Sequence, residues 1–290
     1  AINFLMIGAT MGAVLFVMLL ALLFFSTDSM RRKPVFILNV LAILTGMTTA
    51  IINMYEEVHT LKYPTGVINT HVALAMGCFT AITPTLVEAI LILRLYSVYP
   101  PSSTARVTFV LIIGIPVLVV IGRMANAIVY LVNYAKTVQQ LTSGAASGNI
   151  LMTSNLPCVR IEWSLQLFNN LYCSSLFLFK VYQQGSLSHG PVSLSQRLKT
   201  LFWISVSNFV FPLILSVVQL AIYANNSAHY VTALYVEQVN IQFTIIGVVF
   251  ATVWVAEGQW ADTRRQETLG RTTQLSTLPT TSITSSPSRK

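Results

Sequence analysis

The chain has 290 residues, of which 54% are hydrophobic and only 9% are charged, and its formal net charge is +8. Soluble globular domains carry about 25% charged residues, so this composition excludes a water-soluble fold and predicts an integral membrane protein. The basic residues lie between apolar segments rather than in one patch, which argues against a nucleic-acid partner, and three cysteines cannot build a disulfide framework.

Seven segments are apolar enough to cross a bilayer, which takes about 20 residues of helix. In chain order they cover about 2–25, 34–55, 72–93, 107–134, 161–179, 198–223 and 231–256. Pro34 begins the second segment, where a first-turn proline is favoured. We therefore predict an all-α seven-transmembrane helix bundle over residues 1–261, followed by a tail, 262–290. Because the chain is already apolar at Ala1, we expect the natural protein to begin earlier.

Positive charges predict the orientation, because Lys and Arg concentrate in cytoplasmic loops. Thirteen basic residues fall in the odd-numbered loops and the tail. They are Arg31, Arg32, Lys33, Arg94, Arg106, Lys180, Arg197, Lys199, Arg264, Arg265, Arg271, Arg289 and Lys290. The other side has Lys62, Lys136 and Arg160. The pattern predicts a multi-pass protein of the plasma membrane, with an extracellular N-terminus and a cytoplasmic C-terminal tail.

Two features near the C-terminus fit this orientation. Asn225 begins a glycosylation sequon, Asn-Asn-Ser, in the last predicted outer loop. The segment Thr272–Ser288 is dominated by Ser and Thr and has little apolar surface to bury, so we expect a disordered cytoplasmic tail. Two interpretations of this tail stay open: a solvated end, or a segment whose phosphorylation controls the protein.

Charged side chains inside a predicted span are costly and usually face the bundle interior. Glu88 lies in the inner half of the third span, Arg123 in the outer half of the fourth, and two further acids near the outer ends of the fifth and seventh. These are Glu162 and Glu237. One interpretation is that the four residues pair and fix the packing. The other is that Arg123, Glu162 and Glu237, together with Asn126, line an outer ligand pocket, while Glu88 acts as a switch.

Three further patterns concern helix packing. Gly8 and Gly12 form a Gly-x-x-x-Gly motif, which lets two helices approach closely, within one chain or in a homodimer. Asn39 needs a hydrogen-bond partner in apolar surroundings, which the third or seventh span would supply. Pro212 lies near the middle of the sixth span and removes a backbone hydrogen bond, so it predicts a kink that is either a hinge or fixed architecture.

The segment Arg31–Asn39, with the sequence Arg-Arg-Lys-Pro-Val-Phe-Ile-Leu-Asn, resembles the basic loop and second-helix start of the fungal alpha-factor-type pheromone receptors. These are the class D G-protein-coupled receptors. Other residues follow the family's order: Gly8, Gly12, Glu88, Leu91, Tyr99, Ser207, Asn208, Pro212, Trp254, Val255 and Ala256. The chain departs from the family at 248–251, where the Leu-Pro of the seventh helix is missing, and at Arg94, where the family has a neutral polar residue.

The resemblance implies a receptor that senses an extracellular ligand, a peptide pheromone or another molecule, and signals to a heterotrimeric G protein. On this interpretation, ligand binding shifts the sixth helix about Pro212, and Asn39, Glu88 and Arg94 form a polar latch in the resting state. The basic residues expected to face the G protein are Arg31, Arg32, Lys33, Arg197 and Lys199.

A membrane transporter or channel is the alternative function, and it would need a water-accessible polar path joining Arg123 to Glu88. An enzyme is not expected, because all four histidines fall in predicted loops and no metal-ligand set or catalytic group is evident. A retinal-binding rhodopsin would need a lysine in the seventh span, and the chain has none between Lys199 and Lys290. We therefore expect no cofactor and no metal.

Overall fold

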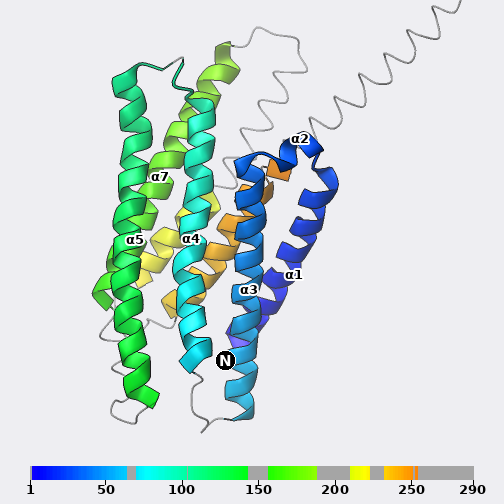
Figure 1. The fold of residues 1–290 in the computed structure, drawn as a ribbon, viewed down its shortest axis with the longest axis vertical. Coiled ribbons are helices and arrows are strands. Elements are labelled where there is room, and N and C mark those ends of the chain that lie inside the picture. Colours follow the sequence, from blue (N-terminus) through cyan, green and yellow to red (C-terminus); the bar gives the residue numbers. More distant parts are fainter. Residues whose placement is uncertain are drawn as a thin grey trace, which may run out of the picture.

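The computed structural model describes residues 2–63, 70–102, 104–142, 156–187, 210–222, 232–250 and 252–253. All regular structure in these residues is helical. The labelled helices are α1 (Ile2–Phe25), α2 (Asp28–Arg31), α3 (Pro34–Lys62), α4 (Thr70–Val98), α5 (Arg106–Thr142) and α7 (Leu156–Leu187). Two more helices, Val210–Ile222 and Thr232–Phe250, follow. The long helices lie side by side as a bundle (Figure 1).

Five helices in the described part of the chain are long and apolar enough to cross a membrane: α1, α3, α4, α5 and Thr232–Phe250. They differ in how much of their apolar stretch is buried, which is 17% in α1 and in α5 but 56% in Thr232–Phe250. Apolar side chains that face outward from a helix bundle suit lipid and not water. The protein is therefore a helical membrane bundle in which Thr232–Phe250 is central and α1 and α5 are peripheral.

α7 is long enough to span a membrane, but it is more polar than those five helices. Its polar residues lie mainly on its buried face. The buried positions recur every three or four residues, as one face of a helix requires. They are Val159, Trp163, Gln166, Asn169, Asn170 and Cys173. Between Ile161 and Phe179 the large exposed side chains are apolar: Ile161, Phe168, Leu171 and Phe179. In this stretch α7 thus turns its amides inward and apolar side chains outward.

The bundle has two ends, which we name by their helices. At the α2 end, α1 and α4 finish while α3 and α5 begin; at the opposite end, α3 and α5 finish while α4 and α7 begin (Figure 1). The short helix α2 was not expected from the sequence. Its backbone turns back through hydrogen bonds from Met30 and Arg31 to the Thr27 carbonyl, so it connects α1 to α3 tightly.

Several predicted boundaries need correction. Pro34 begins its helix as expected, but α3 continues to Lys62 and α4 to Val98, so Arg94 lies inside a helix and not in a loop. His59 and His71 also lie in helices rather than in loops. The predicted kink at Pro212 is not tested, because the residue four positions earlier lies outside the described residues. Arg197, Lys199, Asn225, His189, His229 and the tail 262–290 lie outside them too.

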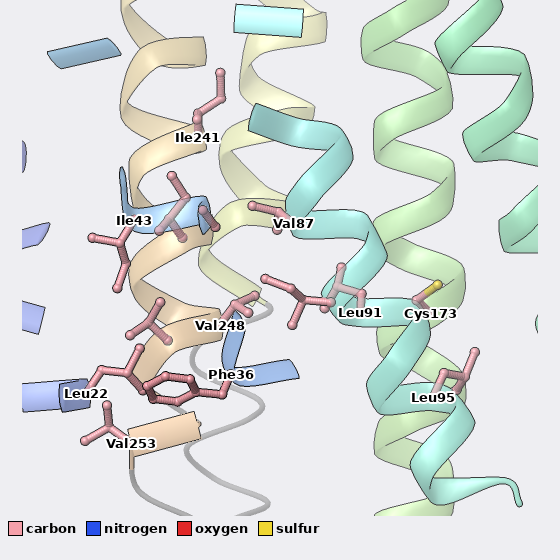
Figure 2. Close-up of a cluster of buried hydrophobic side chains, with 14 of the residues drawn as sticks. Leu22, Phe36, Ile43, Val87, Leu91, Leu95, Cys173, Ile241, Val248 and Val253 are labelled. Atoms are coloured by element: carbon pink, nitrogen blue, oxygen red, sulfur yellow. The ribbon is translucent and has the colours of Figure 1, made fainter. Parts of the chain in front are cut away.

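The apolar core lies between the middle of the bundle and the α2 end. Figure 2 shows side chains from α1, α3, α4, α7 and Thr232–Phe250, together with Val253, in this core. The labelled ones are Leu22, Phe36, Ile43, Val87, Leu91, Leu95, Cys173, Ile241, Val248 and Val253. Because lipid tails are as apolar as these side chains, close packing rather than water exclusion holds such a core together. A Cβ atom on Gly46 would lie 2.7 Å from Ile245 Cδ1 and 2.8 Å from Leu15 Cδ1, which shows how tightly α3 is held between its neighbours.

The Gly-x-x-x-Gly motif of α1 packs against α3 of the same chain. A Cβ atom on Gly8 would lie 3.1 Å from Met54 Cγ and 3.2 Å from the carbonyl oxygen of Ala50. A Cβ atom on Gly12 would lie 3.4 Å from the Cβ of Ala50. The predicted close helix contact is therefore present within one chain, and this glycine face is already occupied.

Replacing Gly8 with leucine should destabilise the bundle, because the backbone of Ala50 cannot move aside as a flexible side chain can. We expect Gly8→Leu to cost roughly 1–3 kcal/mol, the usual range for overpacking. Gly122→Leu is the matched control, since nothing lies within 4 Å of a Cβ at Gly122. Melting temperatures of the two variants in the same detergent check this, and equal values would contradict the assigned contact.

Candidate functional site

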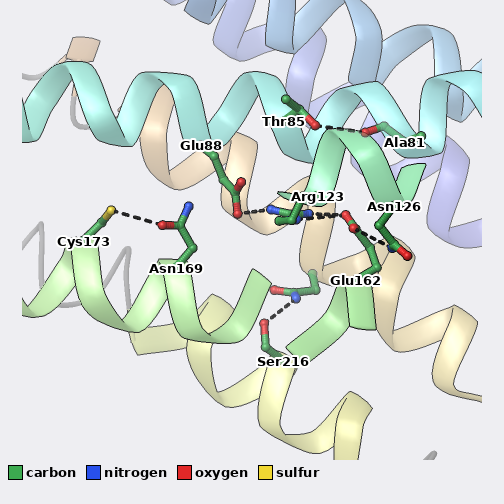
Figure 3. Close-up of polar contacts among 10 residues, drawn as sticks. Ala81, Thr85, Glu88, Arg123, Asn126, Glu162, Asn169, Cys173 and Ser216 are labelled. Atoms are coloured by element: carbon green, nitrogen blue, oxygen red, sulfur yellow. Dashed lines mark hydrogen bonds and ion pairs between the residues drawn. The ribbon is translucent and has the colours of Figure 1, made fainter. Parts of the chain in front are cut away.

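The site is organised around Arg123, whose guanidinium lies between two carboxylates from two other helices. Arg123 on α5 is 1% exposed and pairs through Nη1 with Glu88 on α4, which is 2% exposed. On its other side, Arg123 donates from Nη2 and Nε to Glu162 Oε1 of α7, at 2.5 Å and 3.0 Å. The three residues form a chain of charges that joins α4, α5 and α7 (Figure 3). We call this chain the ion triad.

The ion triad continues into neighbouring polar groups. Asn126 lies one turn from Arg123 and donates from Nδ2 to the Cys158 carbonyl at 2.9 Å and, more weakly, to Glu162 Oε2 at 3.4 Å. The residue after Glu162 is Trp163, on the buried face of α7, and its indole N–H donates to Glu237 Oε1 at 3.0 Å. This last bond connects α7 to the helix Thr232–Phe250.

A pocket lies between α4, α5, α7 and Thr232–Phe250, in the half of the bundle opposite the α2 end. Its empty volume, with the open mouth included, is about 570 Å³. The walls combine apolar and aromatic side chains with a few polar ones. The lining residues are Thr80, Ala81, Pro84, Asn126, Ala127, Tyr130, Cys158, Val159, Glu162, Trp163, Gln166, Leu234 and Glu237. We call this the main pocket.

Pro84 shapes the α4 wall of the main pocket. A proline inside a helix has no N–H to donate and disturbs the turn that precedes it. Two threonines flank it and bond to carbonyls one turn back: Thr83 Oγ1 to the Phe79 carbonyl at 2.7 Å and Thr85 Oγ1 to the Ala81 carbonyl at 3.2 Å. Threonine hydroxyls find an acceptor in this way where no water is at hand. Pro84 was not identified from the sequence.

A layer of buried amides and hydroxyls lies deeper in the bundle than the main pocket. Asn240 donates from Nδ2 to Ser216 Oγ at 2.8 Å, and Ser216 Oγ donates to the carbonyl of Pro212 at 2.8 Å. A smaller cavity, with an empty volume of about 230 Å³ when its opening is included, adjoins this layer and is lined by Pro84, Val87, Glu88, Gln166, Asn170, Ile241 and Thr244. Pro212, the predicted hinge, is thus tied through Ser216 to the central helix.

A second polar cluster stands near the α2 end, and Thr252 is its centre. Asn39 on α3 donates from Nδ2 to Thr252 Oγ1 at 3.0 Å, and Arg94 on α4 donates from Nη2 to the same oxygen at 2.7 Å. Arg94 also donates to the carbonyl of Val248, as does the Thr252 hydroxyl. These bonds fasten α3 and α4 to Val248 and Thr252. We call Asn39, Arg94 and Thr252 the latch.

The structure regroups the site residues predicted from the sequence. Glu88 was expected in a latch with Asn39 and Arg94, but it pairs with Arg123 instead. Glu88 therefore belongs with the predicted pocket residues, and Thr252, which the sequence did not single out, takes its place in the latch. The other pocket residues, Asn126, Glu162 and Glu237, line the main pocket as a group, whereas Arg123 lies beside it.

Arg31, Arg32 and Lys33 are exposed at the α2 end, on the same side as the latch. Arg31 folds back on α1, donating from Nε to Ser26 Oγ at 2.9 Å and from Nη2 to the Leu23 carbonyl at 3.3 Å. The side chains of Arg32 and Lys33 remain exposed, as a surface for an acidic partner requires.

Breaking the ion triad at one member should be costly, because it leaves a buried charge without its partner. We expect Arg123→Met to lower stability by about 3–5 kcal/mol. Adding Glu88→Gln to Arg123→Met should then cost less than the sum of the two single changes, since the second change removes one of the two orphaned carboxylates. Melting temperatures of the two single variants and the double variant check this. Strict additivity would show that Glu88 and Arg123 are not coupled.

No model of a protein family and no curated protein matches this chain. Its likeness to class D receptors therefore stands on residues such as the segment Arg31–Asn39. Its function is inferred from those residues together with the main pocket, the ion triad and the latch.

Proposed function

We propose that the chain is a seven-transmembrane receptor of the plasma membrane that senses an extracellular ligand and signals to a heterotrimeric G protein. The main observation in support is that the pocket and the latch occupy opposite halves of one bundle. Between them lie the ion triad and the amide layer. A receptor needs this separation, because its ligand and its intracellular partner bind at opposite membrane faces.

The count of seven spans combines two groups of helices. Five are the long apolar helices already described. The sixth is α7, whose length suffices and whose outward side chains are apolar, and the seventh contains Val210–Ile222, which continues an apolar stretch of the sequence from Leu198. Seven crossings would place the N-terminus and the C-terminal tail on opposite sides of the membrane.

The closed floor of the main pocket, where Arg123 and Glu88 lie, supports a receptor over a transporter or channel. A transport path would have to connect the main pocket to the α2 end past Arg123 and Glu88. These two side chains are instead paired and only 1% and 2% exposed. The small cavity lined by Glu88, Asn170 and Thr244 is the feature that favours the alternative. Ion flux into proteoliposomes that contain the chain, at rates above those of empty vesicles, would support a transporter or channel.

The proposed signal runs along the central helix Thr232–Phe250. A ligand in the main pocket contacts Glu237 near one end of this helix, and the latch holds the other end through Thr252. Asn240, between them, is bonded to Ser216 and through it to Pro212. A ligand that binds better to a shifted central helix would therefore release the latch and move the helix that carries Pro212, because it can favour only the state it binds more tightly.

The orientation predicts which end of α3 meets the outside of the cell. Lys33 and Lys62 stand at the two ends of this helix, and both are exposed. We expect a membrane-impermeant maleimide to label Lys62→Cys on intact cells and Lys33→Cys only after permeabilisation. The parent chain, with its three native cysteines, gives the background. Labelling of Lys33→Cys on intact cells would reverse the orientation.

Weakening the latch should raise basal signalling. Asn39→Ala and Thr252→Val each remove hydrogen bonds worth about 1 kcal/mol, which shifts a two-state equilibrium about fivefold. The measurement is nucleotide exchange on a G-protein heterotrimer reconstituted with the chain in lipid nanodiscs, without ligand. Thr49→Val is the matched control, since among the described residues this buried hydroxyl bonds only to the Thr45 carbonyl of its own helix.

Basal exchange equal to that of the parent in both latch variants, at equal amounts of folded protein, would contradict the latch. Absence of exchange in every variant and under every ligand tested would contradict the receptor function itself.

A further inference from the structure

The charges around the main pocket do not balance, and this imbalance indicates the kind of ligand that it accepts. Three carboxylates, of Glu88, Glu162 and Glu237, stand in or beside the pocket, and Arg123 lies beside it. Among the described residues, no basic side chain lines either cavity. With all groups ionised, the site has an excess of negative charge.

Arg123 is not open to an anionic ligand. Its guanidinium contacts Glu88 on one side and Glu162 on the other, and it is almost fully buried. An acidic ligand would have to displace one of these carboxylates and leave it without a partner in apolar surroundings, which is costly. A like charge brought beside the carboxylates would be repelled as well.

The carboxylates, in contrast, retain bonding capacity toward the pocket. Glu162 is 21% exposed and lines the pocket, and Glu237 uses only Oε1 to accept the Trp163 N–H among the described residues. Gln166 also lines the pocket and is 8% exposed, so its amide can bond a ligand there.

The walls define the rest of the ligand. The rings of Tyr130 and Trp163 line the pocket together with Ala81, Val159 and Leu234. Aromatic faces attract organic cations, and apolar walls take an apolar body. We propose that the main pocket binds a small amphipathic amine, with its ammonium group between Glu162 and Glu237 and its apolar body against these walls. The inference rests on the proposed receptor function only in treating this pocket as the ligand site.

The test compares three probes of matched shape on the full chain: phenylpropylamine, phenylpropanol and phenylpropionate. Ligands of this size bind with Kd on the order of millimolar, so each is titrated to about 10 mM. The readout is the melting temperature of the detergent-purified protein. We expect the amine to raise it, with an apparent affinity at least about tenfold above those of the alcohol and the carboxylate.

Two variants and one control locate the effect. Glu237→Gln should weaken amine binding about tenfold or more and leave the weak alcohol binding unchanged. Ala127→Phe should fill the pocket and abolish amine binding without changing any charge. Glu57→Gln removes a carboxylate from α3, outside the pocket lining, and should leave amine binding unchanged.

The inference is overturned if the carboxylate or the alcohol binds the parent as well as the amine does, if no probe shifts the melting temperature, or if both pocket variants keep the amine response. Should Glu237→Gln fail to fold, the order of the three probes on the parent still decides. Because no G protein is present, failure here is distinct from failure of the receptor function. Amine binding without any G-protein activation would leave the inference standing and remove the proposed function.

Discussion

A guanidinium inside a membrane bundle constrains everything near it, because arginine keeps its charge in proteins and cannot become neutral as other side chains do. Arg123 is held by carboxylates on opposite sides, which requires α4 and α7 to stand at fixed distances from α5. The same bonds orient Glu162 toward the main pocket and close the interior below it. The position of the pocket and of its floor therefore derives from the need to neutralise one cation.

The interior of this bundle differs in kind at its two halves. Leu22, Phe36 and Leu95 fill the space toward the α2 end, where fit between side chains determines the packing. Toward the other half, amides and acids form hydrogen bonds and ion pairs, and the direction of these bonds determines the packing. Some of these groups have no partner among the described residues, including Asn169 Nδ2 and Asn240 Oδ1. Incompletely satisfied polar layers permit more than one arrangement at similar free energy, whereas a close-packed apolar layer resists change.

Most of the fold follows from the sequence, because runs of about 20 apolar residues are typical of membrane-spanning helices. Pro34 indicates a helix start, and the Gly8–Gly12 motif indicates a close helix contact. The contacts of the buried polar side chains were harder to predict. Glu88 and Arg94 lie six residues apart on one helix, yet one contacts α5 and the other contacts the central helix, a division set by helix rotation and tilt that residue spacing alone does not give. Thr252 and Gly46 carried no signal, since threonine and glycine are common in membrane helices.

α7 has a consequence for how this protein is made. A segment leaves the protein-conducting channel for lipid according to its own apolarity, and a charged residue at the centre of a span opposes this by about 2.5–3.5 kcal/mol. α7 carries Glu162, Gln166, Asn169 and Asn170, so it enters lipid poorly by itself. α5 is synthesised earlier and brings Arg123, which neutralises Glu162 as soon as the two helices meet. Membrane insertion of α7 thus depends on α5, and a substitution of Arg123 would impair the protein during synthesis, before it can bind any ligand.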